Sequence, residues 1–176
     1  MLKLFLLRHA KSSWTDPGLD DLDRPLNARG LRAAAAIGRF MRQSRLNPEL
    51  VLCSPARRAR ETWKLVAEEL RIAPRVIIDE GIYDFGNGGR LLEVARTLAN
   101  GASPLLIVGH NPSMERLAAR LIKSGDPKLI KRLEQKYPTG ALSIIEFPVK
   151  KWSDVAEATG ELLSFTRPAD LEIEAK

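Results

Sequence analysis

The apolar run Leu4-Phe5-Leu6-Leu7 stops abruptly at Arg8-His9, and this ending limits the possible folds more than any other feature. A second run, Leu105–Val108, is followed after a single glycine by His110, the other of the chain's two histidines. Short apolar runs of this kind are typical of buried strands, and open α/β sheets bind ligands at the carboxyl ends of their strands. The pattern therefore predicts one site, suited to a phosphoryl group, to which both histidines contribute.

Composition places the chain among ordinary folded proteins. Its 176 residues, 44% of them hydrophobic, suffice for one domain with a sizeable core. The short N-terminal apolar run matches neither a signal peptide nor a membrane span. The single cysteine, Cys53, excludes an internal disulfide and fits a reducing compartment. We therefore expect a cytoplasmic protein without a membrane partner, in which Cys53 is a small buried hydrophobe.

Positive charge is concentrated in one part of the chain. The net charge is +6, and residues 24–75 carry twelve lysines and arginines against four glutamates, a local balance of +8. A basic surface attracts polyanions, including nucleic acid. However, the chain has no helix-turn-helix, RNA-binding or zinc-finger signature. The sequence thus favours solvated helix faces over a nucleic-acid partner.

Strand-like and helix-like segments alternate through the first 120 residues. We expect strands at 2–7, 50–53, 76–78 and 105–108, helices at 28–45, 54–70, 90–98 and 111–122, and later strands at 141–147 and 161–166. This alternation predicts an α/β fold, a three-layer α/β/α sandwich with a largely parallel central sheet. We expect a single domain over residues 1–168 and a loose, charged tail over residues 169–176.

The segment that follows the second expected strand combines a helix start with several cations. Ser54 and Pro55 suit the N-cap and the first helical position. Arg57, Arg58 and Arg60 follow in the first turn, where cations meet the positive end of the helix dipole. A bound anion would remove that conflict, because helix N-termini and guanidinium groups both suit phosphate. Arg57 and Arg60 are expected to face water, and the pattern leaves Arg58 open between water and phosphate.

Packing alone does not readily explain the combination of Arg8, His9, Arg58 and His110. The predicted sheet brings them to the carboxyl ends of three neighbouring strands, without a carboxylate cluster of the metal-binding kind. A neutral imidazole is a competent nucleophile toward phosphorus. Nearby arginines disfavour its protonation and neutralise phosphoryl oxygens, to which His110 is a further donor. The sequence predicts phosphoryl transfer without a metal ion or other cofactor.

Four motifs resemble those of the histidine phosphatase superfamily, also called phosphoglycerate mutase-like. In chain order they are Leu7-Arg8-His9-Ala10-Lys11, Asp23-Arg24-Pro25-Leu26-Asn27-Ala28-Arg29-Gly30, Ser54-Pro55-Ala56-Arg57-Arg58-Ala59-Arg60-Glu61-Thr62 and Gly109-His110-Asn111-Pro112. The resemblance spans roughly residues 2–122. It implies that His9 is the phosphorylated nucleophile and that Arg8, Arg58 and His110 complete a phosphate pocket. Arg58 matches because it is the arginine directly followed by Ala.

Within the superfamily, the chain looks most like the SixA-type phosphohistidine phosphatases. It is short, has Ala10 where many members have Gly, and leaves about 45 residues between the motif that ends at Thr62 and the motif that begins at Gly109. The larger mutases usually insert extra helices there. The resemblance therefore implies a compact, phosphoglycerate mutase-like fold without a large inserted lid.

The residue that protonates the leaving group is the least certain match to the superfamily. Many members use a Glu that follows the motif corresponding to Ser54–Thr62. Here Asp84 is the best positional match, and Glu80 is the second choice. SixA-type members often lack a clear acid. A phosphoramidate is easier to cleave than an alkyl phosphate, so a weak or absent acid favours phosphohistidine as the substrate. Lys11 and Asn111 are further candidates for binding the phosphate.

Three functions remain open. The first is removal of phosphate from phosphohistidine on a protein through a covalent phosphohistidine on His9, with inorganic phosphate as product. Its partner would be a histidine-phosphorylated protein of the phosphorelay or phosphotransfer type. The second is hydrolysis of a small phosphorylated metabolite by the same mechanism. The third is a non-catalytic, phosphate-dependent binding module. A mutase fits less well, because it must hold its intermediate away from water.

Overall fold

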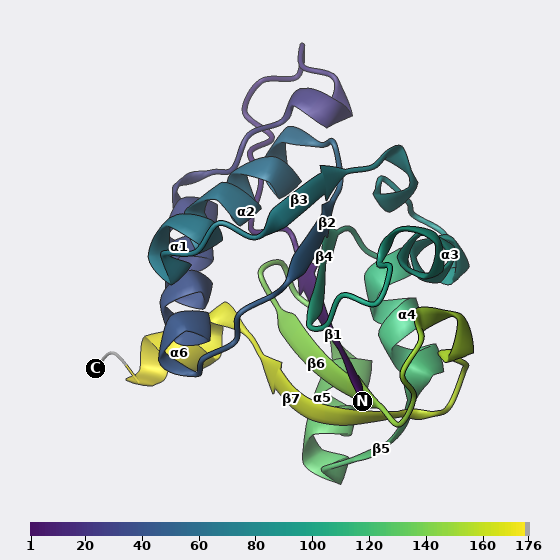
Figure 1. The fold of residues 1–176 in the computed structure, drawn as a ribbon. Coiled ribbons are helices and arrows are strands. Elements are labelled where there is room, and N and C mark those ends of the chain that lie inside the picture. The colour runs from purple at the N-terminus through teal and green to yellow at the C-terminus, as the bar shows by residue number, and fades with distance from the viewer. Residues whose placement is uncertain (175–176) are drawn as a thin grey trace.

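The computed structural model describes residues 1–174 and contains one seven-stranded sheet with helices on both faces (Figure 1). The strand order across the sheet is β3-β2-β4-β1-β6-β7-β5. The strands are β1 (Leu2–Arg8), β2 (Leu50–Cys53), β3 (Arg75–Ile78), β4 (Leu105–Gly109), β5 (Ile122–Gly125), β6 (Leu142–Phe147) and β7 (Gly160–Thr166).

Helices α1, α2 and α6 cover one face of the sheet, and α3, α4 and α5 cover the other (Figure 1). Their bounds are α1 (Ala28–Gln43), α2 (Arg57–Leu70), α3 (Gly89–Leu98), α4 (Ser113–Leu121), α5 (Pro127–Gln135) and α6 (Pro168–Glu174). Short 3-10 turns are η1 (Asp21–Asp23), η2 (Glu80–Ile82) and η3 (Trp152–Asp154). None of the helices within residues 1–174 is long and apolar enough to cross a membrane.

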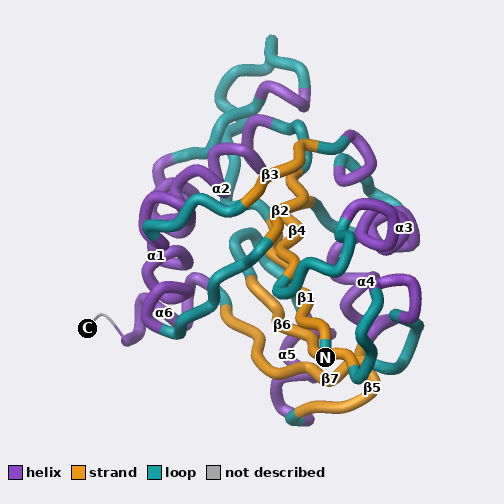
Figure 2. The backbone as a smooth tube through the Cα atoms, viewed as in Figure 1, coloured by secondary structure: helices purple, strands orange, loops and turns teal. Residues whose placement is uncertain are grey.

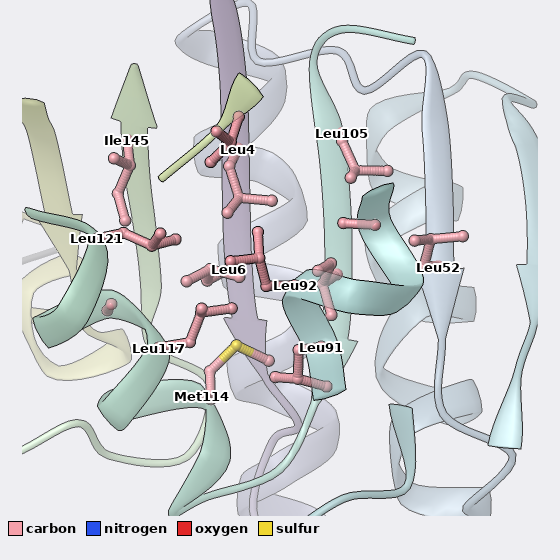
Figure 3. Packing of buried hydrophobic residues seen from close by; sticks show 14 of the residues in the cluster. Leu4, Leu6, Leu52, Leu91, Leu92, Leu105, Met114, Leu117, Leu121 and Ile145 are labelled. Carbon is pink, nitrogen blue, oxygen red and sulfur yellow. The ribbon is translucent and has the colours of Figure 1, made fainter. Parts of the chain in front are cut away.

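The central strands are apolar throughout because both of their faces are buried. In β1, Leu4 and Leu6 join the core under α3 and α4, whereas Phe5 and Leu7 join the core under α1 and α2. Strands β2 and β4 divide their side chains between the two cores in the same way. Figure 3 shows the first core, where Met114 and other side chains of α3 and α4 pack onto Leu4 and Leu6.

The sheet is mixed but largely parallel, as expected. Strands β1, β2, β3 and β4 are parallel to one another, and β5 is parallel to β7. Strand β6 alone runs antiparallel to its two neighbours, β1 and β7. The three-layer α/β/α sandwich predicted from the alternating pattern is therefore confirmed.

The chain between α2 and β4 carries no lid. It forms the edge strand β3, the turn η2 and helix α3, and the last of these packs Leu91 and Leu92 into the core. The longest excursion lies elsewhere, between β1 and α1. This loop carries η1 and projects beyond the sheet at the top of Figures 1 and 2.

Three local expectations were wrong. The helix expected to end at about residue 122 ends at Leu121, but the chain then continues into β5 and α5, neither of which was predicted. Helix α5 does have a start signal, since Asp126 accepts a hydrogen bond from the Lys128 amide and Pro127 follows it. Of the tail expected to be loose over residues 169–176, residues 169–174 belong to α6, and Asp170 binds Arg167 and Arg132; residues 175 and 176 lie outside the described residues.

The third difference concerns the start of α2, which lies at Arg57 instead of Pro55. Ser54 does not cap the helix. Its hydroxyl accepts a hydrogen bond from the Ala56 amide at 3.1 Å and is also bonded to the His110 ring. The serine predicted as a helix cap is therefore a partner of the candidate site.

Helix α1 begins against the chain that follows His9, and Gly30 makes this approach possible. A Cβ on Gly30 would lie 2.0 Å from the Lys11 carbonyl oxygen, so Gly30→Ala must push the helix and this loop apart. We expect Gly30→Ala to lower the free energy of unfolding by about 1–3 kcal/mol, measured by urea denaturation. Gly86→Ala is the control, because its Cβ would meet nothing closer than 3.4 Å. Equal unfolding midpoints for the two variants would contradict this reading.

Candidate active site

The registers of β1, β2 and β4 bring the predicted site residues to one edge of the sheet. Leu7 lies beside Val108, which lies beside Cys53, so the residues that follow these strand ends are neighbours in space. The His9 amide donates to the Gly109 carbonyl at 3.0 Å, and the Ser54 amide donates to the Val108 carbonyl at 3.0 Å. The sequence expectation that both histidines share a site with Arg8 and Arg58 agrees with this placement.

His9 is held in one tautomer. Its Nδ1–H donates to the Ala10 carbonyl oxygen at 2.7 Å, which leaves the Nε2 lone pair without a protein partner among the described residues. Burial, and to a smaller extent the charges of Arg58, Arg8 and Arg24, lower the pKa of His9 to about 3 against the opposing effect of the Ala10 hydrogen bond. His9 is therefore a neutral imidazole at physiological pH, with a free nitrogen lone pair.

The loop after His9 is tied to helix α2 through Thr62. The Thr62 hydroxyl accepts a hydrogen bond from the Ala10 amide at 3.0 Å and donates to the Arg58 carbonyl at 2.7 Å. One buried hydroxyl thus fixes the position of the loop after His9 relative to the helix that carries Arg58. Thr62 ends the motif that begins at Ser54, and the structure gives its presence a physical reason.

Arg58 is 2% exposed, and its guanidinium faces three acceptors. Nη1 donates to the Asp21 carbonyl at 2.6 Å, and Nη2 donates to the Asp21 carboxylate at 3.0 Å and to His110 Nδ1 at 3.3 Å. Arg57, by contrast, is exposed and paired with Glu61, as expected. The sequence left open whether the Arg58 side chain faces water or the site. In the structure it faces the site.

Two buried donors in the site have no hydrogen-bond partner within residues 1–174. Nε of Arg8 and Nε of Arg58 are both buried without a hydrogen bond. Arg8 also donates through Nη1 to the Tyr137 carbonyl at 2.9 Å, and burial lowers its pKa. An unpaired buried donor on a charged group costs about 1–3 kcal/mol or more, so the arrangement favours an incoming anion.

His110 completes the group on the side of β4. Because an arginine only donates, His110 Nδ1 accepts from Arg58, and Nε2–H donates to the Ser54 hydroxyl at 2.7 Å. Burial, and to a smaller extent the nearby His9 and Arg58, lower the pKa of His110 to about 2. The His9 and His110 ring centroids are 5.2 Å apart. His110 can donate from Nδ1 to a phosphoryl oxygen once an anion makes its protonation favourable.

These residues surround a cavity of about 270 Å³ at the carboxyl edge of the sheet. Its lining comprises Arg8, His9, Lys11, Ser12, Trp14, Asp21, Arg24, Arg58, Phe85, His110, Asn111 and Thr139. We call it the catalytic pocket. Trp14 and Phe85 are exposed at its rim, and the Arg24 guanidinium lies 3.5 Å from the Trp14 ring centroid.

Sequence reasoning missed two charged residues of the pocket, Asp21 and Arg24. The Asp21 carboxylate accepts from Arg24, Arg58 and the Tyr83 hydroxyl. Burial alone would raise the pKa of Asp21, but the hydrogen bonds from Tyr83 and Arg58 lower it to about 2. Both residues lie in a loop without a regular hydrophobic period. The available sequence signals were the three-residue separation of Asp21 and Arg24 and the proline that follows Arg24. Arg24 is buried and also donates to the Ser12 hydroxyl at 2.7 Å.

The tentative site residues have different positions. Asp84 does not line the catalytic pocket, and its carboxylate accepts from the Gly86 amide of its own loop. Glu80 is exposed on η2 and does not line the pocket either. Asn111 does line it, although its amide is engaged by the Tyr137 carbonyl and by Glu115. Lys11 lines the pocket with an exposed side chain.

Cys53 lies at the end of β2, and its side chain is buried. Burial raises the pKa of the Cys53 thiol to about 12, as suits the small buried hydrophobe that we expected. Within residues 1–174, no three His, Cys, Asp or Glu side chains come together in a way that could hold a metal ion.

Comparison with known proteins relates this pocket to a family. The family model described as the histidine phosphatase superfamily (branch 1) matches residues 4–89. An uncharacterized protein of Mycobacterium tuberculosis, Rv1276c, is 34% identical over 92% of this chain and 99% of its own length. The sequence stretches that carry Arg8, His9 and Arg58 all lie within the family match.

Solved structures resemble the fold over nearly the whole chain. The proposed phosphohistidine phosphatases SixA from Nakamurella multipartita and Agrobacterium tumefaciens superpose with TM-scores of 0.81 and 0.77, each at 27% identity. Both matches cover 95% of this chain, and 96% and 98% of those chains respectively. The mycobacterial glucosyl-3-phosphoglycerate phosphatase Rv2419c shares the fold at a TM-score of 0.63 and 16% identity. The fold thus also occurs in a phosphatase of a small metabolite.

The lowered histidine pKa values predict how stability depends on pH. His9 and His110 are neutral when folded but bind protons below pH 6.5 when unfolded, so the unfolded state gains protons as the pH falls. Stability is therefore highest above pH 6.5 and falls toward pH 3, by up to about 1.4 kcal/mol per pH unit for each histidine. Urea unfolding at pH 7 and pH 4.5 should show a smaller loss for His9→Asn than for the wild type. Parallel losses would show that His9 is not held neutral.

Proposed function

Because the chain belongs to the histidine phosphatase superfamily, we propose that it is a phosphatase that removes phosphate from phosphohistidine on a protein, through a covalent intermediate on His9. The observation that carries the proposal is the combination of a free Nε2 lone pair on His9 with two unpaired guanidinium donors in one pocket. The lone pair is the nucleophile, and the unpaired donors suit phosphoryl oxygens.

The reaction follows in two displacements. Solvent first protonates the unphosphorylated ring nitrogen of the substrate's phosphohistidine. His9 Nε2 then attacks phosphorus, the bond between phosphorus and the substrate's ring nitrogen breaks, and the imidazole leaves as a neutral ring with the bonding electron pair. Water then attacks the phosphorus of phosphorylated His9, the Nε2–phosphorus bond breaks, and phosphate leaves while the water's proton passes to solvent. The pocket arginines neutralise the phosphoryl oxygens in both steps.

The absence of a working acid supports phosphohistidine over an ester. Among the described residues that line the pocket, Asp21 is the one carboxylate, and its lowered pKa keeps it ionised. An alkoxide leaving group needs a proton donor in the transition state, whereas imidazole is a stable leaving group. The uncovered pocket also suits a substrate presented on the surface of another protein. The pocket therefore supports the protein substrate better than a metabolite.

The first test compares substrates. We expect phosphate release, in the presence of EDTA, from a histidine-phosphorylated carrier protein at a far higher kcat/KM than from a panel of small phosphate esters. His9→Ala should lower turnover by more than about 10³-fold, because it removes the nucleophile. Circular dichroism confirms that the variant is folded. Faster turnover of the esters would assign the chain to metabolite hydrolysis, and no turnover of either class would indicate a binding module.

Two adjacent arginines provide the second test. Arg58→Ala removes a buried donor of the pocket, and we expect kcat/KM to fall by about 10²–10³-fold. Arg57→Ala removes an exposed side chain paired only with Glu61, and we expect less than about a twofold change. Equal losses would show that the phosphate pocket is not built on Arg58. The two proteins have the same net charge, so a general electrostatic effect is controlled.

A further inference from the structure

Two further cavities lie beside the catalytic pocket along the surface. The first, of about 230 Å³, shares Lys11 and Thr139 with the catalytic pocket. The second, of about 510 Å³, shares Ala33, Pro168 and Glu172 with the first. The shared lining residues make the three cavities neighbours on the surface. The two further cavities, which we call the basic groove, lie where α1 and α6 pack side by side (Figure 1).

The basic groove carries a strong excess of positive charge. Its charged lining consists of Lys11, Arg29, Arg32, Arg39, Lys136 and Arg167, with Glu172 as the one carboxylate among the described residues. Arg39 pairs with Glu69, and Arg167 pairs with Asp170. The other four cations have no carboxylate within 4.0 Å among the side chains that the structure describes. Four such cations around one groove favour an anionic occupant.

Helix α1 adds a second reason for an anion. Arg29 lies in its first turn, which contains no acidic residue, so this cation meets the positive end of the helix dipole. Elsewhere on α1 the same face carries Arg32 and Arg39. Arg29 and Arg32 are three residues apart on α1, about 4.5 Å along the helix, and Lys11 and Lys136 add two cations from other segments. Several separate cations suit an occupant with several anionic groups, such as an acidic protein surface, better than a single phosphoryl group.

The basic groove and the catalytic pocket share one rigid frame. The Gly140 amide donates to the carbonyls of Arg8 and His9, each at 3.0 Å, and Gly140 also packs against Pro168 of the groove. On the other side, the Lys11 carbonyl accepts from the Asn27 amide at 3.0 Å. An anionic surface seated in the groove would therefore lie at a fixed position relative to His9.

From the charge of the basic groove and its place beside the catalytic pocket, and resting on the proposed function, we propose that the basic groove docks an acidic stretch of the histidine-phosphorylated protein. The phosphohistidine of that protein enters the catalytic pocket while carboxylates beside it meet Arg29, Arg32 and Lys136. Charged pairs of this exposed kind act mainly on the association rate and are sensitive to salt. The groove thereby selects acidic protein substrates over small phosphoramidates.

The test uses a charge-reversed variant, Arg29→Glu/Arg32→Glu/Lys136→Glu, of the full chain. The control, Lys64→Glu/Lys123→Glu/Lys128→Glu, changes the net charge equally at exposed lysines outside the groove. Two probes are hydrolysed: phosphoimidazole, and a histidine phosphotransfer domain with acidic residues beside its phosphohistidine. For the groove variant we expect kcat/KM on the domain to fall at least about tenfold at low salt, mainly through KM. Phosphoimidazole turnover should change less than twofold, and the control should resemble the wild type.

Other outcomes overturn the proposal in distinguishable ways. Unchanged kinetics of the groove variant on the domain would contradict docking in the groove but leave the proposed function intact. Equal losses on both probes would show that the substitutions act on the catalytic pocket itself. If the wild type hydrolyses only small esters, the proposed function and the docking site fall together. A groove variant impaired only on a bisphosphorylated small ester would assign the groove to a second phosphate. Salt-sensitive nucleic-acid binding that the variant loses, with unchanged domain kinetics, would assign it to nucleic acid.

Discussion

A buried guanidinium, that of Arg58, is the constraint on which the site depends. Removing such a charge from water costs several kcal/mol unless partners surround it. Asp21 supplies a carboxylate and a carbonyl, and His110 supplies a ring nitrogen lone pair. The same positive charge opposes protonation of both histidines and keeps Asp21 ionised. Burial is the larger cause of the low histidine pKa values, and the charge of Arg58 acts in the same direction on both rings.

The sheet stabilises this arrangement because it fixes the positions of the site residues without a bound ligand. Parallel register places the ends of β1, β2 and β4 side by side. The loop after β1 is then held by the Thr62 hydroxyl, which accepts from the Ala10 amide, and by the Gly140 amide, which donates to the carbonyls of Arg8 and His9. A site held in this way keeps its geometry when it is empty, so little reorganisation is needed when a phosphoryl group arrives. The unpaired donors of Arg8 and Arg58 are tolerated because the surrounding structure holds them in place.

The parts of the fold predicted correctly from sequence are those determined locally. Continuous apolar runs identified β1, β2 and β4, and polar residues directly after them identified His9 and His110. Asp21 and Arg58, by contrast, are 37 positions apart, and nothing in the periodicity of either segment indicates that they meet. Ser54 was misread because a helix cap and a histidine partner have the same local sequence. Helix α6 was missed because its stability depends on packing against α1 and on the Asp170 ion pairs.

Asp21 also affects how strongly the catalytic pocket binds an anion compared with the basic groove. In the free protein its carboxylate already neutralises Arg24 and Arg58, so an arriving phosphoryl group exchanges with a resident anion for those donors. Such an exchange gains less free energy than binding to two unpaired cations, and the pocket alone therefore binds a phosphoryl group moderately. Arg29, Arg32 and Lys136 have no such internal counterion among the described side chains. In the docking that we propose, discrimination between phosphorylated substrates therefore rests on the surface next to the phosphate, while the pocket carries out the proposed chemistry.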